Sequence, residues 1–390
     1  MNRLVLGDSL DALLDHRGKT PKKLGGDFAP AGIPVASALL VRDGRLDLSG
    51  ARYVSDEMYA KWMPERTRRG DVILTSEAPA GRVARVDTDD PLVLGQRLFC
   101  LRGKAGVLDS GFLYYALQSH AVQTSILGHS TGTTVVGIRQ SALRLVQIPA
   151  PSFPEQQAIA EVLGALDDKI AANTALASTA ESFSASIAAT APASIPLGSL
   201  AELSKQQLHP ESLGDRFVDH FSLPAFDAGA LPSTELASAI KSSKFVLTEE
   251  SILLSKLNPR FPRVWRAAPA SRPALASTEF LVLRSPEVTT RLLWASISDP
   301  TFAKALDARV AGTSGSHQRV KPADALTVKI RDPRALPERA QSLIEHVLRA
   351  ASLAREESRT LAATRDALLP QLMSGKLRVR DAIRAAKEVV

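Results

Sequence analysis

Two long amphipathic stretches dominate the pattern of apolar and polar positions along the chain. The first begins at Pro154 and extends to about Thr190, which is ~55 Å of helix. Its apolar residues recur three and four positions apart, at Ile159, Val162, Leu163, Leu166, Ile170 and Leu176. The second runs from about Pro337 to Leu369 and carries Leu343, Ile344, Val347, Leu348, Leu353, Leu361, Leu368 and Leu369. One small domain cannot cover such helices, so we expect an antiparallel pair; two independent surface helices are the alternative.

The segments that precede these helices alternate between strand and helix patterns. "GDVILTSEAPAGRVARV" (70–86) predicts a strand, a turn and a second strand, and residues 96–103 and 277–286 are strand-like runs. Residues 110–127 and 288–306 have helical patterns. Each globular part is therefore predicted to be mixed α/β.

The chain contains an internal repeat with an offset of 180 positions. "VILTS" (72–76) matches "ILLSK" (252–256), and Gly132-Thr133 matches Gly312-Thr313. Arg139 and Arg319 keep this spacing, and two residues are then inserted before the closing strands. The predicted fold class is α+β: two mixed α/β domains joined by two long antiparallel helices, with a pseudo-twofold internal repeat. The expected limits are 1–152 and 192–335 for the domains, and 153–191 and 336–390 for the helices and the C-terminal tail.

Charge adds a possible ligand class to this picture. The net charge is +7, which suits either a solubility surplus or a polyanion partner. The distribution favours the polyanion, because residues 251–278 contain five basic residues and no acidic one.

Cysteine content and hydropathy indicate the cellular compartment in which the protein is expected. The single Cys100 excludes an internal disulfide and lies in an apolar run, so a buried core residue is favoured over a nucleophile. The N-terminus is too charged for a signal peptide, and no apolar run approaches ~20 residues. We therefore expect a cytoplasmic protein without a membrane partner.

Several patterns resemble catalytic motifs but are incomplete. "NPRF" (258–261) has Arg260 where the N-P-P-F/Y loop of amino-methyltransferases has its second proline, and no G-x-G-x-x-G loop precedes it. Asp167-Asp168-Lys169 matches a nuclease fragment but falls on the polar face of the first long helix. The histidines show no zinc-binding spacing. We predict no catalytic residue, no metal and no cofactor.

The remaining features suit nucleic-acid binding. Glycines and small hydroxyls in "HSTGTT" and "AGTSGSH" let backbone amides approach phosphates, although turn formation alone would explain each loop. Gln140 and Asn258 are residue types that read base edges. His317 is either loop surface or a contact. The candidate DNA-contacting residues are Thr75, Arg82, Gly132, Thr133, Arg139, Gln140, Lys256, Asn258, Arg260, Arg263, Thr313, His317, Arg319 and Lys321.

The order of these elements resembles the specificity subunit of type I restriction-modification systems over nearly the whole chain. The most specific stretches are "IPAPSFPEQQAIAEVLGALDDKI" and "ALLPQLMSGKLRV"; the second copy, "RDPRALPERAQSLIEHVL", lacks the P-x-P and E-Q-Q of the first. The resemblance implies two target-recognition domains that each read half of a split DNA sequence, and helices that act as a spacer. It also implies three partners: double-stranded DNA, two methyltransferase subunits and a motor-nuclease (restriction) subunit. The alternatives are a stand-alone DNA methyltransferase or nuclease, and a coiled-coil scaffold.

Overall fold

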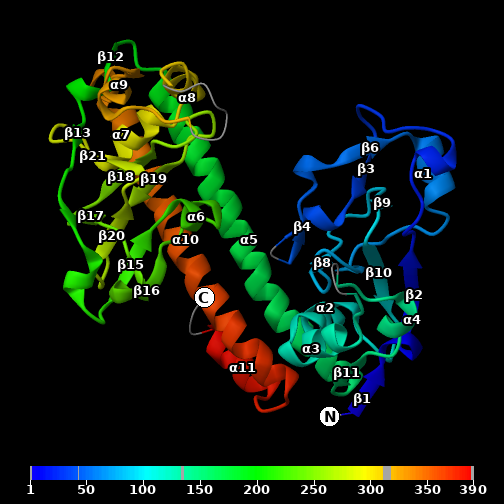
Figure 1. The fold of residues 1–390 in the computed structure, drawn as a ribbon. Helices are drawn as coiled ribbons and strands as arrows, with labels where there is room; N and C mark the ends of the chain where they lie inside the picture. Colours follow the sequence, from blue (N-terminus) through cyan, green and yellow to red (C-terminus); the bar gives the residue numbers. More distant parts are fainter. Residues whose placement is uncertain (1, 43, 133–135, 311–317, 388–390) are drawn as a thin grey trace. The chain divides into compact units, whose positions relative to one another are not determined.

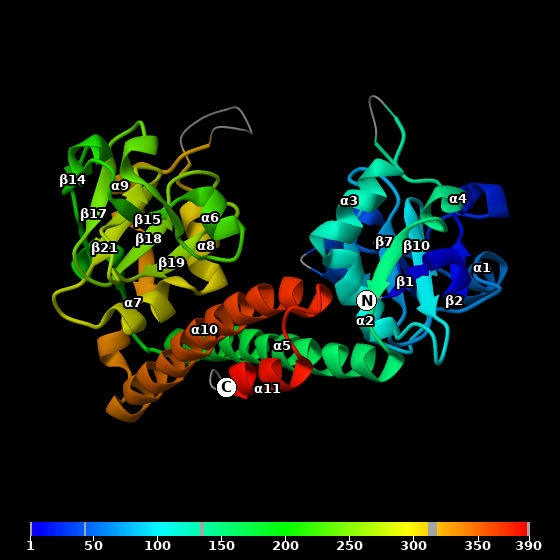
Figure 2. The same cartoon turned by 90° about the horizontal axis from the view of Figure 1, so that it is seen from below.

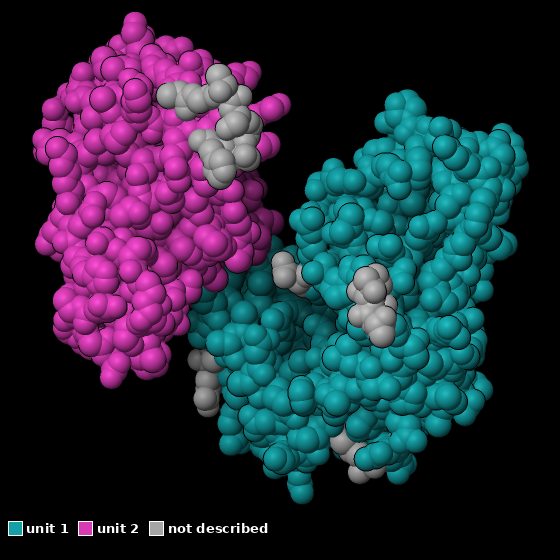
Figure 3. All heavy atoms as spheres, in the orientation of Figure 1, with its two compact units in different colours: residues 1–172, 357–390 teal, residues 173–356 magenta. Residues whose placement is uncertain are grey.

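The computed structural model describes residues 2–42, 44–132, 136–310 and 318–387. It divides into two compact units, one formed by residues 1–172 with 357–390 and the other by residues 173–356 (Figure 3). Each unit contains one globular part and a portion of both long helices. This division cuts the helices, whereas the limits expected from the sequence follow the helix ends, and those domain limits remain a prediction.

The two long helices, α5 (Phe153–Ala189) and α10 (Glu338–Met373), pair within each unit (Figure 1). In the first unit, Leu166 of α5 shares a core with Leu361 and Leu368 of α10. In the second unit, Ala177 and Ala180 of α5 pack with Ala351 of α10. The start of α5 thus meets the end of α10, and the predicted antiparallel pair is confirmed.

The second helix extends past the proline at which the sequence pattern places its end. Pro370 lies inside α10, which continues to Met373. A proline removes one backbone donor, and here the buried side chains of Leu372 and Met373 in the core of the first unit stabilise the last turn. The helix α11 (Val379–Lys387) follows and buries Ala382 in the same core (Figure 2).

The globular part of the first unit combines small sheets with helices. A four-stranded antiparallel sheet has the order β2-β10-β7-β8, a three-stranded sheet has the order β6-β3-β9, and β1-β11 and β4-β5 form pairs. The strands are β1 (Asn2–Val5), β2 (Leu10–Asp15), β3 (Ile33–Ala36), β4 (Val41–Arg42), β5 (Arg45–Leu46), β6 (Arg52–Val54), β7 (Val72–Thr75), β8 (Val83–Arg85), β9 (Val93–Leu94), β10 (Leu98–Gly103) and β11 (Gln147–Ala150). The helices are α1 (Asp56–Trp62), α2 (Ser110–Gln118), α3 (His120–Gly128) and α4 (Gln140–Leu143).

The predicted helix over residues 110–127 is two helices. Ser119 has extended backbone angles, with φ −66° and ψ 144°, and separates α2 from α3. Its hydroxyl donates a hydrogen bond to the Ala116 carbonyl at 2.7 Å, which stabilises the break. Serine competes with helical backbone bonds in this way, and an apolar periodicity does not reveal it.

The second unit repeats this plan and adds a larger sheet. The sheet β13-β21-β18-β19 and the pair β12-β22 correspond to those of the first unit, and a five-stranded sheet has the order β14-β17-β20-β15-β16. The strands are β12 (Ser194–Pro196), β13 (Glu202–Leu203), β14 (Gln207–Leu208), β15 (Phe217–Phe221), β16 (Ser233–Leu236), β17 (Lys244–Leu247), β18 (Ser251–Ser255), β19 (Val264–Ala267), β20 (Ala274–Ser277), β21 (Phe280–Arg284) and β22 (Lys329–Arg331). The helices are α6 (Leu223–Asp227), α7 (Thr290–Ile297), α8 (Pro300–Asp307) and α9 (Pro322–Leu326). The predicted fold class, including the internal repeat, is confirmed.

Candidate nucleic-acid interface

In the first unit, the turn between β7 and β8 is joined to the glycine-threonine loop. The Ile138 amide donates to the Ser76 carbonyl at 2.8 Å, and Glu77 forms an isolated β-bridge with Gly137. A Cβ atom at Gly137 would lie only 3.0 Å from the Glu77 Cβ and 3.1 Å from the Ser76 carbonyl oxygen. Glycine therefore permits the close approach that makes the turn and the loop one surface.

The second unit makes the same junction between the β18–β19 turn and its own loop. The Val320 amide donates to the Lys256 carbonyl at 3.0 Å, and the Asn258 amide donates to the Gln318 carbonyl at 2.9 Å. The backbone of Asn258 is left-handed, with φ 48°, and so is that of Ala78 at the matching place of the first turn, with φ 58°. The repeat thus extends to an unusual backbone conformation.

The hydrogen-bond register shows which basic residues of the two copies are structurally equivalent, and this differs from the equivalence that the sequence spacing predicted. Leu257 forms its β-bridge with Arg319, as Glu77 does with Gly137, so the counterpart of Arg319 is Gly137. Arg139 and Lys321 are the extended residues that precede α4 and α9, and they form the equivalent pair. The two inserted residues therefore lie before Arg319, and not after it as the sequence spacing indicated. Backbone register, and not residue identity, decides the equivalence.

The candidate residues of the first unit differ in exposure. Arg82, Gly132 and Arg139 are exposed, and Gln140 is half-buried at the start of α4. Thr75 is fully buried; its hydroxyl donates to the Pro79 carbonyl at 2.7 Å and accepts from the Arg82 amide at 2.9 Å. Thr75 shapes the turn and presents no side chain at the surface, so we leave it out of the DNA-contacting set.

Two candidate arginines of the second unit are held by carboxylates. Arg263 makes paired hydrogen bonds of 2.7 and 2.9 Å to Asp227, and these lower the pKa of the Asp227 carboxyl. Arg319 binds Glu279 at 2.9 and 3.2 Å. Such surface pairs orient the guanidinium groups and contribute little to the stability of the fold. DNA phosphates would compete with these carboxylates for the same arginine donors.

The β18–β19 turn also exposes cations and an aromatic ring. Arg260 of this turn is exposed and Lys256 at its start is half-buried; Lys321, on the loop segment before α9, is also exposed. Phe261 is 67% exposed, and its amide donates to the Asn258 carbonyl at 2.9 Å, which tightens the turn beneath the ring. The candidates Thr133, Thr313 and His317 lie outside the described residues.

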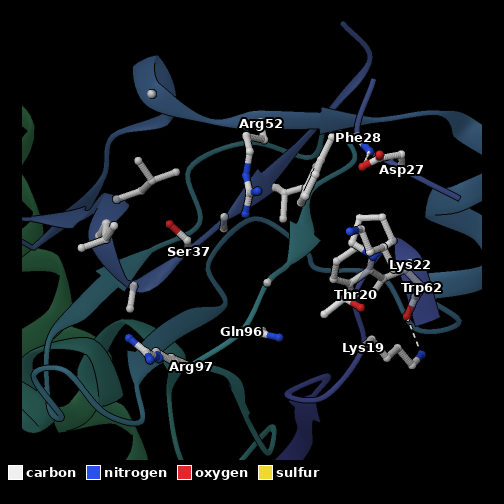
Figure 4. Close-up of a pocket in the computed structure, with 18 of the residues that line it drawn as sticks. Lys19, Thr20, Lys22, Asp27, Phe28, Ser37, Arg52, Trp62, Gln96 and Arg97 are labelled. Atoms are coloured by element: carbon white, nitrogen blue, oxygen red, sulfur yellow. Dashed lines mark hydrogen bonds between the residues drawn. The ribbon is translucent and has the colours of Figure 1, made fainter. Parts of the chain in front are cut away.

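Sequence reasoning missed a cavity of about 520 Å³ beside the β7–β8 turn (Figure 4). Ala78 of the turn lines it, and Arg97, which also lines it, pairs with Glu77 of the turn at 3.0 Å. Lys19, Lys22 and Arg52 add positive charge. The basic run "GKTPKK" (18–23) was the only signal for it in the sequence, and its distance along the chain from Arg97 concealed the cluster.

The incomplete nuclease motif has a structural role. Asp167 accepts hydrogen bonds from the Tyr115 hydroxyl and from Arg365, each at 2.6 Å, and Lys169 pairs with Glu357 at 3.3 Å. These side chains join the long helices to each other and to α2. Among the described residues, no group of three acidic, histidine or cysteine side chains has the geometry of a metal site.

Comparison with known proteins finds a family similarity in the N-terminal part of the chain. Residues 16–182 match the model of the type I restriction modification DNA specificity domain. These residues are therefore similar to a type I specificity domain. The matched residues include the β7–β8 turn, the glycine-threonine loop and most of α5.

Curated relatives of this chain include specificity subunits of type I restriction enzymes. The specificity subunit of the type I restriction enzyme MjaIX from Methanocaldococcus jannaschii is 38% identical over 102 residues, which are 26% of this chain and 23% of that protein. The MjaVIII specificity subunit of the same organism is 26% identical over 149 residues, or 37% of this chain and 35% of that protein. The matches thus span about a third of the relatives' length or less. The predicted resemblance to a specificity subunit is confirmed.

A solved structure shares the whole fold. The S subunit of a type I restriction-modification system from M. genitalium superposes with a TM-score of 0.58 at 17% identity, over 95% of each chain. This likeness extends the fold of the specificity subunits to the second unit. In the described part of the chain, no helix is both long and apolar enough to cross a lipid bilayer.

Proposed function

We propose that this chain is the DNA-recognition subunit of a type I restriction-modification system and reads a bipartite target, one half with each unit. The observation that carries the proposal is the duplicated junction of turn and loop. Both units build it with the same backbone register and surround it with different side chains. Two related surfaces with different chemistry suit two different half-sites.

The charges around the second junction support DNA as the ligand. Five cations (Lys256, Arg260, Arg263, Arg319 and Lys321) lie on its two segments, against the two carboxylates of Asp227 and Glu279. Exposed carboxylate pairs are weak and salt-sensitive, so a phosphate backbone can displace them.

The long helices support the proposed assembly with methyltransferase and restriction subunits. Leu176 and Phe183 lie seven residues apart on α5 and are about half exposed, and Leu353 of α10 is also exposed. Apolar side chains on one helical face favour a protein partner. A subunit that reads chromosomal DNA would act in the cytoplasm.

Salt dependence tests DNA binding. Neutralising about five phosphates predicts a slope near −4.5 for the logarithm of affinity against the logarithm of salt. The measurement is a gel shift of the full chain on duplex DNA at NaCl concentrations from about 50 to 200 mM. A flat response would contradict DNA binding and favour the coiled-coil scaffold.

Half-site selectivity tests the bipartite reading. Methylome sequencing of a host with and without this chain gives the motif and its gap. Lys256→Gln should then weaken binding to duplexes that retain only the second half-site, and Arg139→Gln those that retain only the first. Equal loss on both duplexes would contradict the assignment of one half to each unit. Methyl transfer by the purified chain alone would instead establish the enzyme alternative.

A further inference from the structure

The cavity beside the β7–β8 turn combines unpaired cations with an apolar lining. Its polar side includes Arg52, whose guanidinium lies 3.7 Å from the centre of the Phe28 ring. Within the part of the chain that the structure describes, neither Arg52 nor Lys22 has a carboxylate partner. The stack on Phe28 orients the Arg52 donors and leaves them available to an anion.

Buried apolar residues also line the cavity, and one of them, Val35, is the strand partner of Arg52. These residues are Val35, Ala36, Ala38, Leu40 and Trp62. Gly95 closes against this lining, since a Cβ atom there would lie 2.3 Å from the Ala36 carbonyl oxygen. Figure 4 shows Arg52 directed into the cavity between Ser37 and Phe28. The lining therefore offers apolar area for a flat group and, next to it, positive charge for an anion.

The remaining charged residues also favour an anionic ligand. Lys19 lines the cavity and donates to the Trp62 carbonyl at 2.6 Å, and Arg97 is paired with Glu77. Asp27 is the carboxylate among the described lining residues. Four cations against one carboxylate exclude a purely apolar ligand, because such a ligand would strip water from unpaired charges.

We propose that this cavity binds one nucleotide, with its phosphate on Arg52 and Lys22 and its base against the apolar lining. Inorganic phosphate alone would leave the apolar lining uncovered, whereas a base with its phosphate uses both the apolar and the cationic residues. A volume of about 520 Å³ is within the range of small-ligand sites. The nucleotide is either free or part of DNA held at the adjacent turn; the second source rests on the proposed function, and the first does not.

Two variants and one control test the site with free ligand. Arg52→Gln removes the oriented charge, and Ser37→Leu fills the cavity without changing its charge; Ser37 makes no side-chain cap bond that the change would break. Arg69→Gln is the control, because Arg69 is exposed, pairs with Asp89 and does not line the cavity. Saturation-transfer NMR with dAMP, dCMP, dGMP and dTMP should show binding that is at least tenfold weaker in Arg52→Gln, absent in Ser37→Leu and unchanged in Arg69→Gln.

A second arm identifies the source of the nucleotide. Target duplexes carry 2-aminopurine at single positions of the first half-site, and unstacking of one base into the cavity raises its fluorescence. The rise should disappear in Ser37→Leu and persist in Arg69→Gln. Mononucleotide binding without this rise identifies a free nucleotide. Absence of both signals overturns the proposal, while the gel shift of the wild-type chain decides separately whether the proposed function holds.

Discussion

Gly81 and Phe261 occupy equivalent positions in the two repeated turns, but only Phe261 presents a side chain at the surface. Counted from the preceding strands β7 and β18, Phe261 takes the place of Gly81. Gly81 has φ 92° and accepts a hydrogen bond from the Gln123 amide at 2.8 Å, so its turn is tied to α3. Phe261 stands between Pro259 and Pro262, which restrict the backbone beneath an exposed ring. A ring held in this way loses little freedom on binding.

Phe261→Ala should therefore weaken binding to the second half-site. An aromatic contact with a base contributes about 1–3 kcal/mol, so a loss of roughly tenfold in affinity is expected. Phe217→Ala is the matched control, because Phe217 is also exposed but lies on β15, in the other sheet of the second unit. Gel shifts on duplexes with a single half-site measure both variants. Equal effects of the two substitutions would show that Phe261 has no special role.

Cys100 links burial to stability at alkaline pH. Burial raises the pKa of its thiol, and Asp71, whose carboxylate lies 3.5 Å from Sγ, raises it further. The thiol of an unfolded cysteine has a pKa of about 8.5, so only the unfolded chain loses this proton as the pH rises past that value. The folded state should lose stability above about pH 8.5.

This effect is measured by thermal unfolding of the wild-type chain and of Cys100→Ala. The pH is varied from about 7 to about 9.5, which spans the titration of an unfolded cysteine. The wild-type Tm should fall more steeply than that of the variant. Parallel curves would show that Cys100 does not set the alkaline limit.

At the scale of elements, one carboxylate of α5 in each unit joins three elements. Asp167 binds Tyr115 of α2 and Arg365 of α10. Glu181 binds Arg355 of α10 at 2.6 Å and Arg266 of β19 at 3.6 Å. The pairing of the long helices is thereby coupled to the attachment of each globular part.

Asp167→Asn should destabilise the first unit by about 2–3 kcal/mol, because two charge-assisted hydrogen bonds are weakened at a mostly buried position. Its neighbour provides the control: Asp168 is 74% exposed and lies 3.5 Å from Arg85, so Asp168→Asn should change stability by less than about 0.5 kcal/mol. Urea unfolding of both variants measures the difference. Equal midpoints would contradict the joining role of Asp167.

At the scale of the whole molecule, the continuous helices α5 and α10 belong to both units, and the proposed function makes them the spacer between half-sites. Inserting one heptad into each helix, at the 172/173 and 356/357 junctions, preserves the packed face and adds about 10 Å of helix. At about 3.4 Å per base pair, the gap in the target should grow by roughly three base pairs.

Methylome sequencing of a host that carries the lengthened chain measures the gap. Both half-sites should be unchanged, because the turns and loops are untouched. A gap of the original length in a folded, active variant would show that the helices do not set the spacing.

Local patterns predicted the long helices, the mixed sheets and the turn-loop segments, because strand alternation, helical periodicity and glycine spacing are properties of neighbouring residues. The same patterns did not predict three features of the folded chain. Ser119 breaks one helix, Pro370 is accommodated within another, and Thr75 is a buried turn residue and not a surface contact. The helix at Pro370 depends on packing in the core of the first unit. The break at Ser119 and the orientation of Thr75 depend on side-chain hydrogen bonds, which apolar periodicity does not report.

The sequence by itself determined the repeat, the residue types in the paired loops and the likeness to a specificity subunit. Tertiary structure decided which of those residues are equivalent, which are held by carboxylates and which enclose a cavity. Arg263 and Asp227 are 36 positions apart, and the cavity joins Lys19 to Arg97 across the first unit. Charge pairing and enclosed volume are properties of distances in space, so only the folded chain determines them.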